Sequence, residues 1–283
     1  MGYTSSFRLE GSDRYDILSE ADSDATHVNL LTATIAANKM KGAISQTFFG
    51  ASGKWDSPHV YGAALARILL QRLSNQTHAT CDCTHTSPIL LHMQHICGCV
   101  SRCGHNTAHA HNAVRDIVVA SANAIGLVAT PEPNGLDVVI VGKDGSRDKR
   151  RPDARIVSTT TSFSALLDFT VLHSTTQSYY GKSIKAEAEA KNDKKQLRYK
   201  PVLGTEVLTV ACITSSGGIL PPFDDVLNKI VSDRAQEWIT IDDLRGRTRV
   251  ALANALGRIV AGDTKSRQTR ARIAAPRLWK PNS

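Results

Sequence analysis

Two aspartates, each in or beside a strand-like segment, constrain this chain more than any other feature of its sequence. Asp153 closes the tripeptide Arg-Pro-Asp, and fourteen residues separate it from Asp168 in the apolar run Ala-Leu-Leu-Asp-Phe-Thr-Val-Leu. Alternation along that run places Asp168 and Thr170 on one face of a strand and Phe169 on the other. A charge inside a hydrophobic strand is costly unless a partner or a solvent-facing cleft receives it, so the sequence predicts such a partner.

A glutamate upstream and a lysine downstream complete a set that suits phosphate chemistry. Glu132 lies between two prolines at the end of a predicted strand, and Lys195 lies in a predicted helix after Asp168. Paired carboxylates hold a hard divalent cation such as Mg²⁺ or Mn²⁺ through oxygen, and the cation activates water and stabilises charge on phosphate. A lysine adds positive charge beside that phosphate. The set predicts a metal-dependent phosphodiesterase centre, with Asp153 and Asp168 as the metal ligands.

The charge of the chain points to a polyanionic partner. The 283 residues carry a formal net charge of +8, and the isoelectric point is about 9.3. A basic balance of this kind is typical of proteins that bind nucleic acid. The hydrophobic content of 41% is ordinary for a globular protein of one or two domains. Neither a long apolar run nor a signal peptide is found in the sequence, so we expect an intracellular protein without a membrane span.

Cysteine and histidine gather in one short segment. Five of the six cysteines lie between residues 81 and 103, interleaved with histidines, which suits a metal site better than disulfides in a reducing compartment. The spacing Cys81-x-Cys83, eight residues, His92, four residues, Cys97 supplies four ligands for a closed, structural Zn²⁺ site. Further candidate ligands, between which the spacing does not decide, are His85, His95, Cys99, Cys103 and His105.

Periodicity along the rest of the chain predicts an alternation of helices and strands. Helices are expected at 28–44, 58–73, 108–125, 183–199, 222–231 and 234–260. Strands are expected at 127–132, 138–141, 154–157, 165–173 and 205–213, with a charged turn over 142–151. Cys212 lies in the last of these strands and is expected to be a buried thiol. The pattern predicts a mixed α/β domain with helical material on both sides.

The predicted helix over 183–199 is rich in basic residues. Two interpretations of this helix remain open. Its charges are typical of a solvated face with ion pairs between residues four apart. They also suit the phosphate backbone of a nucleic acid. Under the second interpretation, the nucleic-acid-binding residues are Lys191, Lys194, Arg198 and Tyr199.

The order of these motifs resembles the C-terminal region of site-specific non-LTR retrotransposon proteins. The matching motifs are the Cys81-x-Cys83-x8-His92-x4-Cys97 set, a helix bearing His111, Glu132-Pro133, Arg151-Pro152-Asp153, the strand acid Asp168 and Lys195-x-x-Arg198-Tyr199. They span roughly residues 81–218, about half of the chain. In that family a zinc knuckle precedes a restriction-like endonuclease domain, and both follow a reverse transcriptase.

For the fold, the resemblance implies a restriction-endonuclease-like, PD-(D/E)xK core. Such a core is a mixed α/β sheet flanked by helices, here with a small zinc knuckle and helical extensions at both ends. The implied domains are a helical N-terminal extension with a disordered start over 1–78, the knuckle over 79–105, the endonuclease domain over 106–240 and a basic helical extension over 241–283.

For function, the resemblance implies nicking of one DNA strand with Mg²⁺ or Mn²⁺, with element RNA as a further partner and the nucleus as the location. Asp153 and Asp168 correspond to the metal-binding acids of the family, and Glu132 corresponds to its upstream glutamate. Lys195 corresponds best to the helix-borne lysine, with Lys191 as the alternative. The knuckle ligands, which would hold Zn²⁺, correspond to Cys81, Cys83, His92 and Cys97.

The sequence also departs from the family pattern. Thr170 stands two residues after Asp168, where restriction enzymes usually carry a lysine, and Ala110 replaces the arginine that often precedes the helix histidine, here His111. The acid pairs at 224–225 and 242–243 lack the aromatic residue that a polymerase motif carries two places upstream. The alternative function is therefore a non-catalytic, nucleic-acid-binding remnant of a reverse transcriptase-endonuclease protein.

Overall fold

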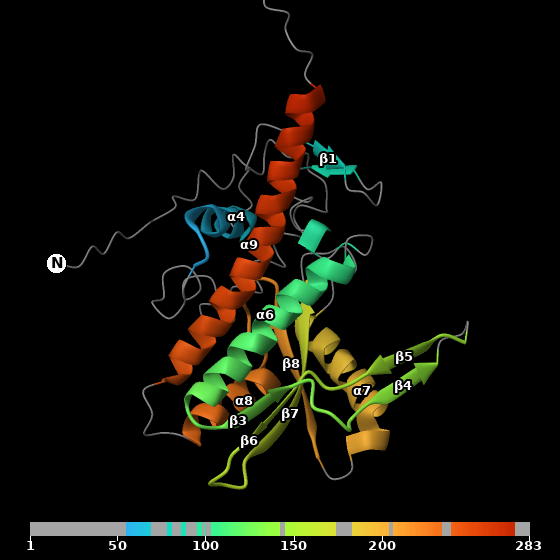
Figure 1. Cartoon of the computed structure of the whole chain (residues 1–283), viewed down its shortest axis with the longest axis vertical. Helices are drawn as coiled ribbons and strands as arrows, with labels where there is room; N and C mark the ends of the chain where they lie inside the picture. Colours follow the sequence, from blue (N-terminus) through green and yellow to red (C-terminus); the bar gives the residue numbers. More distant parts are fainter. Residues whose placement is uncertain are drawn as a thin grey trace, which may run out of the picture.

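The computed structural model describes residues 55–68, 78–80, 86–88, 95–97, 99, 103–141, 145–173, 183–203, 206–233 and 239–274. These residues form a mixed α/β fold in which helices flank a mixed sheet (Figure 1). The predicted helix at 28–44 and most of the predicted knuckle lie outside the described residues. Within the described part, no helix has the length and apolar character needed to cross a bilayer.

Four strands form the central sheet, in the order β3 (Val128–Pro131), β6 (Ala154–Val157), β7 (Ser164–Leu172) and β8 (Leu208–Thr214). Strands β3, β6 and β7 pair antiparallel, whereas β7 and β8 pair parallel. Parallel neighbours need a long crossover connection, and α7 (Ile184–Leu203) supplies it. The apolar run around Asp168 is therefore a central strand, which explains why so much of β7 is buried.

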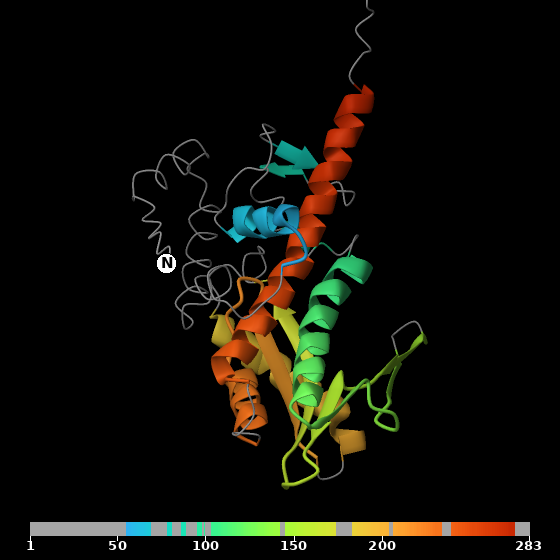
Figure 2. The same ribbon diagram turned by 60° about the vertical axis from the view of Figure 1, so that its left-hand side comes forward.

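Helices cover both faces of this sheet (Figures 1 and 2). On one face α6 (Cys103–Ala124), α8 (Pro221–Ser232) and α9 (Ile241–Ala274) enclose the larger core, which includes Phe169. On the other face α7 packs over a smaller core, in which Leu166 and Leu172 of β7 contact Tyr199 and its neighbours. The predicted alternation along β7 is confirmed, because Phe169 and Leu166 belong to opposite faces.

On the N-terminal side, α4 (Pro58–Ile68) packs across α9 at a glycine. A Cβ atom added to Gly257 would lie 2.6 Å from the carbonyl oxygen of Val60, so the two helix backbones can approach this closely only with glycine at that position. Ala64 and Ala253, two further small residues, are buried together beside this crossing.

Most predicted elements are present in the described segments, but several bounds differ and one predicted turn contains a strand. Among the described residues, the helix predicted at 234–260 begins at Ile241 and continues to Ala274. The predicted charged turn at 142–151 contains strand β5 (Arg147–Arg150), which pairs antiparallel with β4 (Val138–Val141). A ribbon with a face in water needs no apolar residue there, so the charged side chains do not prevent strand pairing. The helix predicted at 183–199 continues to Leu203, past Pro201, because Leu203 is buried against the sheet.

A helix and a hairpin are among the elements that the structure describes before α6. The helix predicted at 58–73 is confirmed as far as Ile68. An antiparallel hairpin of β1 (His78–Thr80) and β2 (Thr86–Pro88) follows at the start of the predicted knuckle. Periodicity did not predict this hairpin, because a strand of three residues is too short to show an alternation.

Candidate active site

Three acids lie next to one another across three strands of the sheet. The β6–β7 register pairs Ala154 with Leu167, so Asp153, one residue before β6, comes opposite Asp168. The backbone N–H of Asp153 donates to the carbonyl oxygen of Leu167 at 2.9 Å, and the N–H of Glu132 donates to the carbonyl oxygen of Asp153 at 2.8 Å. The tripeptide acid and the strand acid are therefore neighbours, as the sequence predicts.

A lysine from the crossover helix forms an ion pair with the carboxylate of Asp168. The Nζ atom of Lys195 lies 2.5 Å from Oδ1 of Asp168. It also donates to the hydroxyl of Thr170 at 2.6 Å and to the carbonyl oxygen of Phe169 at 3.1 Å. Of the two candidate lysines, Lys195 is therefore the one at the acids, and the partner predicted for the buried charge is present. Lys191 is half-buried one helical turn earlier.

A histidine from the helix on the opposite face reaches the other acid. The Nε2 atom of His111 in α6 lies 3.0 Å from Oδ1 of Asp153. The second oxygen of Asp153, Oδ2, accepts the backbone N–H of Phe169 at 2.6 Å. The ring of His111 also meets that of Phe169 edge to face, with 6.4 Å between the ring centres. Two donors and one ring contact thus fix the position of the Asp153 carboxylate.

The two carboxyl groups have opposite pKa shifts although they are neighbours. Burial raises the pKa of Asp168 from 3.8 to about 6; the charge of Asp153 adds to this rise, and that of Lys195 opposes it. Burial acts on Asp153 as well. Hydrogen bonding and charge from His111, a hydrogen bond with Asp168 and the N–H of Phe169 outweigh burial and hold the pKa of Asp153 below its usual value. The first proton that the pair takes up as the pH falls through about 6 therefore resides on Asp168, while Asp153 stays ionised.

Glu132, the third predicted acid, has a different environment. Its backbone adopts a left-handed conformation, with φ of 44°, which a residue other than glycine rarely adopts. Its side chain is 54% exposed, and its Oε1 atom accepts a hydrogen bond from Nη1 of Arg115 at 2.9 Å. Among the described residues, no three acid, histidine or cysteine side chains converge as ligands of one metal ion. Asp153 and Asp168 are brought together, whereas the Glu132 carboxylate pairs with α6.

The structure corrects the role predicted for Tyr199. This side chain was expected on a nucleic-acid-binding surface, but it is only 2% exposed. Its hydroxyl donates to the carbonyl oxygen of Arg151 at 2.9 Å. Burial, together with the charges of Asp168 and Asp153, raises the pKa of Tyr199. Tyr199 therefore anchors the segment that leads into Asp153 and cannot stack on a base in this arrangement.

The remaining predicted residues on α7 differ in exposure. Lys194 is exposed, whereas Lys191 and Arg198 are half-buried. Burial raises the pKa of Cys212 in β8 to about 11, although the positive charges of Lys195 and Lys191 oppose this rise. The prediction that Cys212 is a buried thiol is confirmed. A thiol with so high a pKa stays protonated at neutral pH and is a poor nucleophile.

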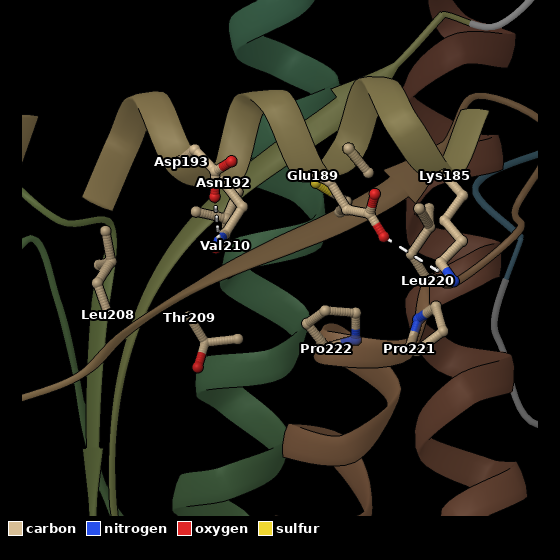
Figure 3. Close-up of a pocket in the computed structure, with 12 residues that line it drawn as sticks. Lys185, Glu189, Asn192, Asp193, Leu208, Thr209, Val210, Leu220, Pro221 and Pro222 are labelled. Atoms are coloured by element: carbon tan, nitrogen blue, oxygen red, sulfur yellow. Dashed lines mark hydrogen bonds and ion pairs between the residues drawn. The ribbon is translucent and has the colours of Figure 1, made fainter. Parts of the chain in front are cut away.

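A cavity of about 430 Å³ lies beside the acids, between α7, β8 and the start of α8 (Figure 3). Leu208, Val210 and Leu220 are among its apolar lining residues. Val210 is the β8 partner of Asp168 in the strand register, so the cavity begins one strand away from the acids. Two lining residues on α7, Lys185 and Glu189, form an ion pair at 3.9 Å (Figure 3).

The predicted zinc ligands are only partly covered by the structure. Cys81, Cys83 and His92 lie outside the described residues. Cys97 is described and is fully buried, in contact with the larger core, and Cys99 is buried as well. The Zn²⁺ site therefore stays a prediction from the sequence.

The sequence did not predict the roles of two residues of α6 at this site. His111 and Arg115 are four residues apart, which places them on one side of the helix. Each reaches an acid, and the two acids, Asp153 and Glu132, are on adjacent strands. The apolar stripe of α6 guided the prediction, and His111 lies beside that stripe. The spacing of a histidine and an arginine four residues apart was the signal that could have identified them.

Comparison with models of known protein families gives no match for this chain, and comparison with curated proteins gives no match either.

Proposed function

We propose that the chain is a metal-dependent endonuclease that nicks DNA by hydrolysing a phosphodiester bond. One observation carries the proposal: Asp153 and Asp168 adjoin across two strands, and Lys195 reaches Asp168 from the crossover helix. A pair of buried carboxylates beside a lysine suits the stabilisation of charge on a phosphate. The order α6, β3, β6, β7, α7, β8 agrees with the restriction-endonuclease-like core that the sequence motifs imply, with β4 and β5 as an insertion.

The two acids fit a hard divalent cation. Both carboxyl groups are mostly buried, and the negative charge of Asp153 helps to raise the pKa of Asp168 to about 6. A cation held through their oxygens relieves that repulsion, and Asp153 and Asp168 are the residues that would hold Mg²⁺ or Mn²⁺. When bound, such an ion supplies charge stabilisation for the phosphate and an activated water.

The remaining residues act around this pair. His111 donates to Asp153 and keeps its carboxylate in place, while Lys195 brings a positive charge to the same point from α7. Glu132 is tied to Asp153 through the backbone, and Arg115 orients its carboxylate at the edge of the site. Its half-exposed position suits a residue that orients water better than a residue that binds the ion tightly.

The proposed substrate is duplex DNA, and the net charge of +8 supports it. Element RNA is a further proposed partner, and a nuclear location is part of the same proposal because chromosomal DNA is there. The zinc knuckle of Cys81, Cys83, His92 and Cys97 would position the nucleic acid next to the acids.

The second candidate function is a nucleic-acid-binding domain without turnover. It is favoured by the 2.5 Å contact of Lys195 with Asp168, because this lysine already neutralises part of the charge that would attract a metal ion. The pairing of Glu132 with Arg115 also favours it.

Conversion of supercoiled plasmid to open circles separates the two functions. The endonuclease proposal predicts nicks that need Mg²⁺ or Mn²⁺, stop with a chelator and carry a 3′ hydroxyl that a polymerase can extend. The second candidate function, a binding domain without turnover, predicts binding to the same plasmid without any nicks.

A further inference from the structure

The ribbon of β4 and β5 projects from the body of the protein beside the acids. Figures 1 and 2 both show it extending away from the central sheet, with the base of β4 beside α7. Its register pairs Val138 with Arg150, Val139 with Lys149, and Val141 with Arg147. Residues opposite each other in an antiparallel pair project from the same face, so the ribbon has two faces of different composition.

One face of the ribbon packs against the protein. Val138 is partly buried against the smaller core, together with residues of α7. The other face is exposed: Val139 is 54% and Val141 is 64% accessible, and the side chains opposite them, Lys149 and Arg147, are exposed as well. Exposed branched apolar residues between cations form a surface unlike the polar surface of an ordinary solvated hairpin.

The exposed face carries a row of positive charge. Arg147 and Lys149 of β5, and the half-buried Arg151 just after it, follow one another at every second residue, about 7 Å apart along an extended chain. One acid accompanies them: Asp137, whose carboxylate lies 2.9 Å from Nζ of Lys149 and 3.2 Å from Nε of Arg151. The hydrogen bond from Lys149 lowers the pKa of Asp137, so the acid stays ionised and orients two of the cations. Three positive charges against one negative charge favour a polyanion.

The base of the ribbon is fixed to the candidate site. After β5, the chain passes through Arg151 and the buried Pro152 directly into Asp153. The hydroxyl of Tyr199 holds the carbonyl oxygen of Arg151 at 2.9 Å. Only two residues separate the end of β5 from Asp153, so a ligand bound to the ribbon is held at a fixed position relative to Asp153.

We propose that the exposed face of the β4–β5 ribbon grips the backbone of duplex DNA and sets which phosphate lies at Asp153 and Asp168. This inference rests on the proposed DNA substrate and adds the element that positions it. The major groove of B-form DNA, about 12 Å wide, admits a two-stranded ribbon. The major groove of duplex RNA is deep and narrow, and side chains do not enter it, so the ribbon fits DNA better than RNA. The two exposed valines are too few for a stable protein interface, which buries about 800 Å² per partner.

The test is DNA binding by the full chain in the Asp168→Asn background, where no cleavage disturbs the equilibrium. The ribbon variant is Arg147→Gln with Lys149→Gln. Its matched control is Lys229→Gln with Arg258→Gln, which removes the same charge from α8 and α9 on the other side of the sheet. Binding to a short fluorescein-labelled duplex DNA is measured by anisotropy over a range of salt concentrations, with a duplex RNA of the same sequence as competitor.

We expect the ribbon variant to lose about two units from the slope of log K against log salt, since each phosphate contact contributes about 0.9. The control should keep the slope. A charge-conserving swap, Arg147→Lys with Lys149→Arg, should retain both binding and slope, which would show that the positive charges, and not the particular side chains, make the contact. Equal slopes in ribbon variant and control, or preference of the unmodified ribbon for duplex RNA, would overturn the inference.

Failure of this inference is distinct from failure of the proposed function. If the protein nicks DNA but the ribbon variant binds DNA with an unchanged salt slope, the endonuclease proposal stands and the proposed role of the ribbon is refuted. If the protein never nicks DNA but the ribbon variant has a smaller salt slope, the proposed role of the ribbon stands and the endonuclease proposal is refuted.

Discussion

The imidazole of His111 hydrogen-bonds Asp153, with 3.0 Å between Nε2 and Oδ1, although α6 and β7 cover that carboxylate from different directions. The contact explains in part why the pKa of Asp153 is lowered while that of its neighbour Asp168 is raised. One helix thereby keeps one acid of the pair ionised and ready for a cation, which is the condition that metal binding requires.

His111→Ala should weaken Mn²⁺ binding about tenfold or more, the effect expected for a residue that orients a metal ligand. His111→Gln keeps an N–H donor and should retain most of the affinity. The exposed His109 on the same helix provides the control, His109→Ala. Calorimetric titration with Mn²⁺ measures the affinity of each variant. Equal affinities of His111→Ala and His109→Ala would show that the contact does not prepare Asp153 for metal.

Lys195→Ala should lower the free energy of unfolding by about 2 kcal/mol, because it leaves the buried Asp168 without its charged donor. It should also slow nicking, but less than Asp168→Asn does. Urea denaturation measures the stability, and Lys194→Ala, at an exposed position on the same helix, is the control. In the double variant Lys195→Ala with Asp168→Asn, most of the lost stability should return, since no unpaired charge remains. A double variant no more stable than Lys195→Ala alone would refute the coupling.

Metal binding should depend on pH through Asp168. Its folded pKa of about 6 lies above the 3.8 of an ordinary aspartate, so protons stabilise the folded state. Without metal, the contribution of Asp168 to the free energy of unfolding is complete below about pH 4 and falls as the pH rises through about 6. Mn²⁺ needs the ionised carboxylate, so its affinity should rise as the pH passes through about 6, by about tenfold between pH 5 and pH 7.

Titration of Mn²⁺ at several pH values checks this dependence, and Asp168→Asn is the control that should lack it. A wild-type affinity that does not change between pH 5 and pH 7 would mean that Asp168 is not a ligand.

The purified protein should carry about one Zn²⁺ per chain if the knuckle forms. Cys83→Ser should abolish that zinc, whereas Cys212→Ala, at a thiol buried in the sheet, should leave it unchanged. Inductively coupled plasma mass spectrometry measures the content. Full zinc in Cys83→Ser would exclude Cys83 as a ligand and promote Cys99, Cys103 and His105 as candidates.

The sequence placed Asp168 in a strand because the alternation of side chains along a strand depends only on neighbouring residues. Asp168 interrupts a run of apolar residues, and β7 has the alternation that such a run implies. The four residues of β4 were predicted with the bounds they have, since a run of branched residues has few alternatives to a strand. A charged acid in such a strand implied a partner, and Lys195 is that partner.

Contacts that depend on the packing of distant elements could not be read from the same patterns. His111 reaches Asp153 only because α6 packs against β3, β6 and β7, and no periodicity within α6 reveals which strands it meets. Tyr199 looked like a surface aromatic beside basic residues, but the helix turns it inward onto Arg151. Strand β5 was missed because its four charged residues pair with β4 through the backbone alone.

The central claim, that Asp153 and Asp168 form a catalytic metal site, is tested most directly by nicking of supercoiled plasmid with Asp168→Asn. The matched control is Asp225→Asn, the same change at an exposed position of α8. The account predicts that wild type and Asp225→Asn produce open circles with Mg²⁺ or Mn²⁺, and that Asp168→Asn binds the plasmid but leaves it supercoiled. Nicking by Asp168→Asn at the rate of the control, or no nicking by wild type with either metal, would contradict it.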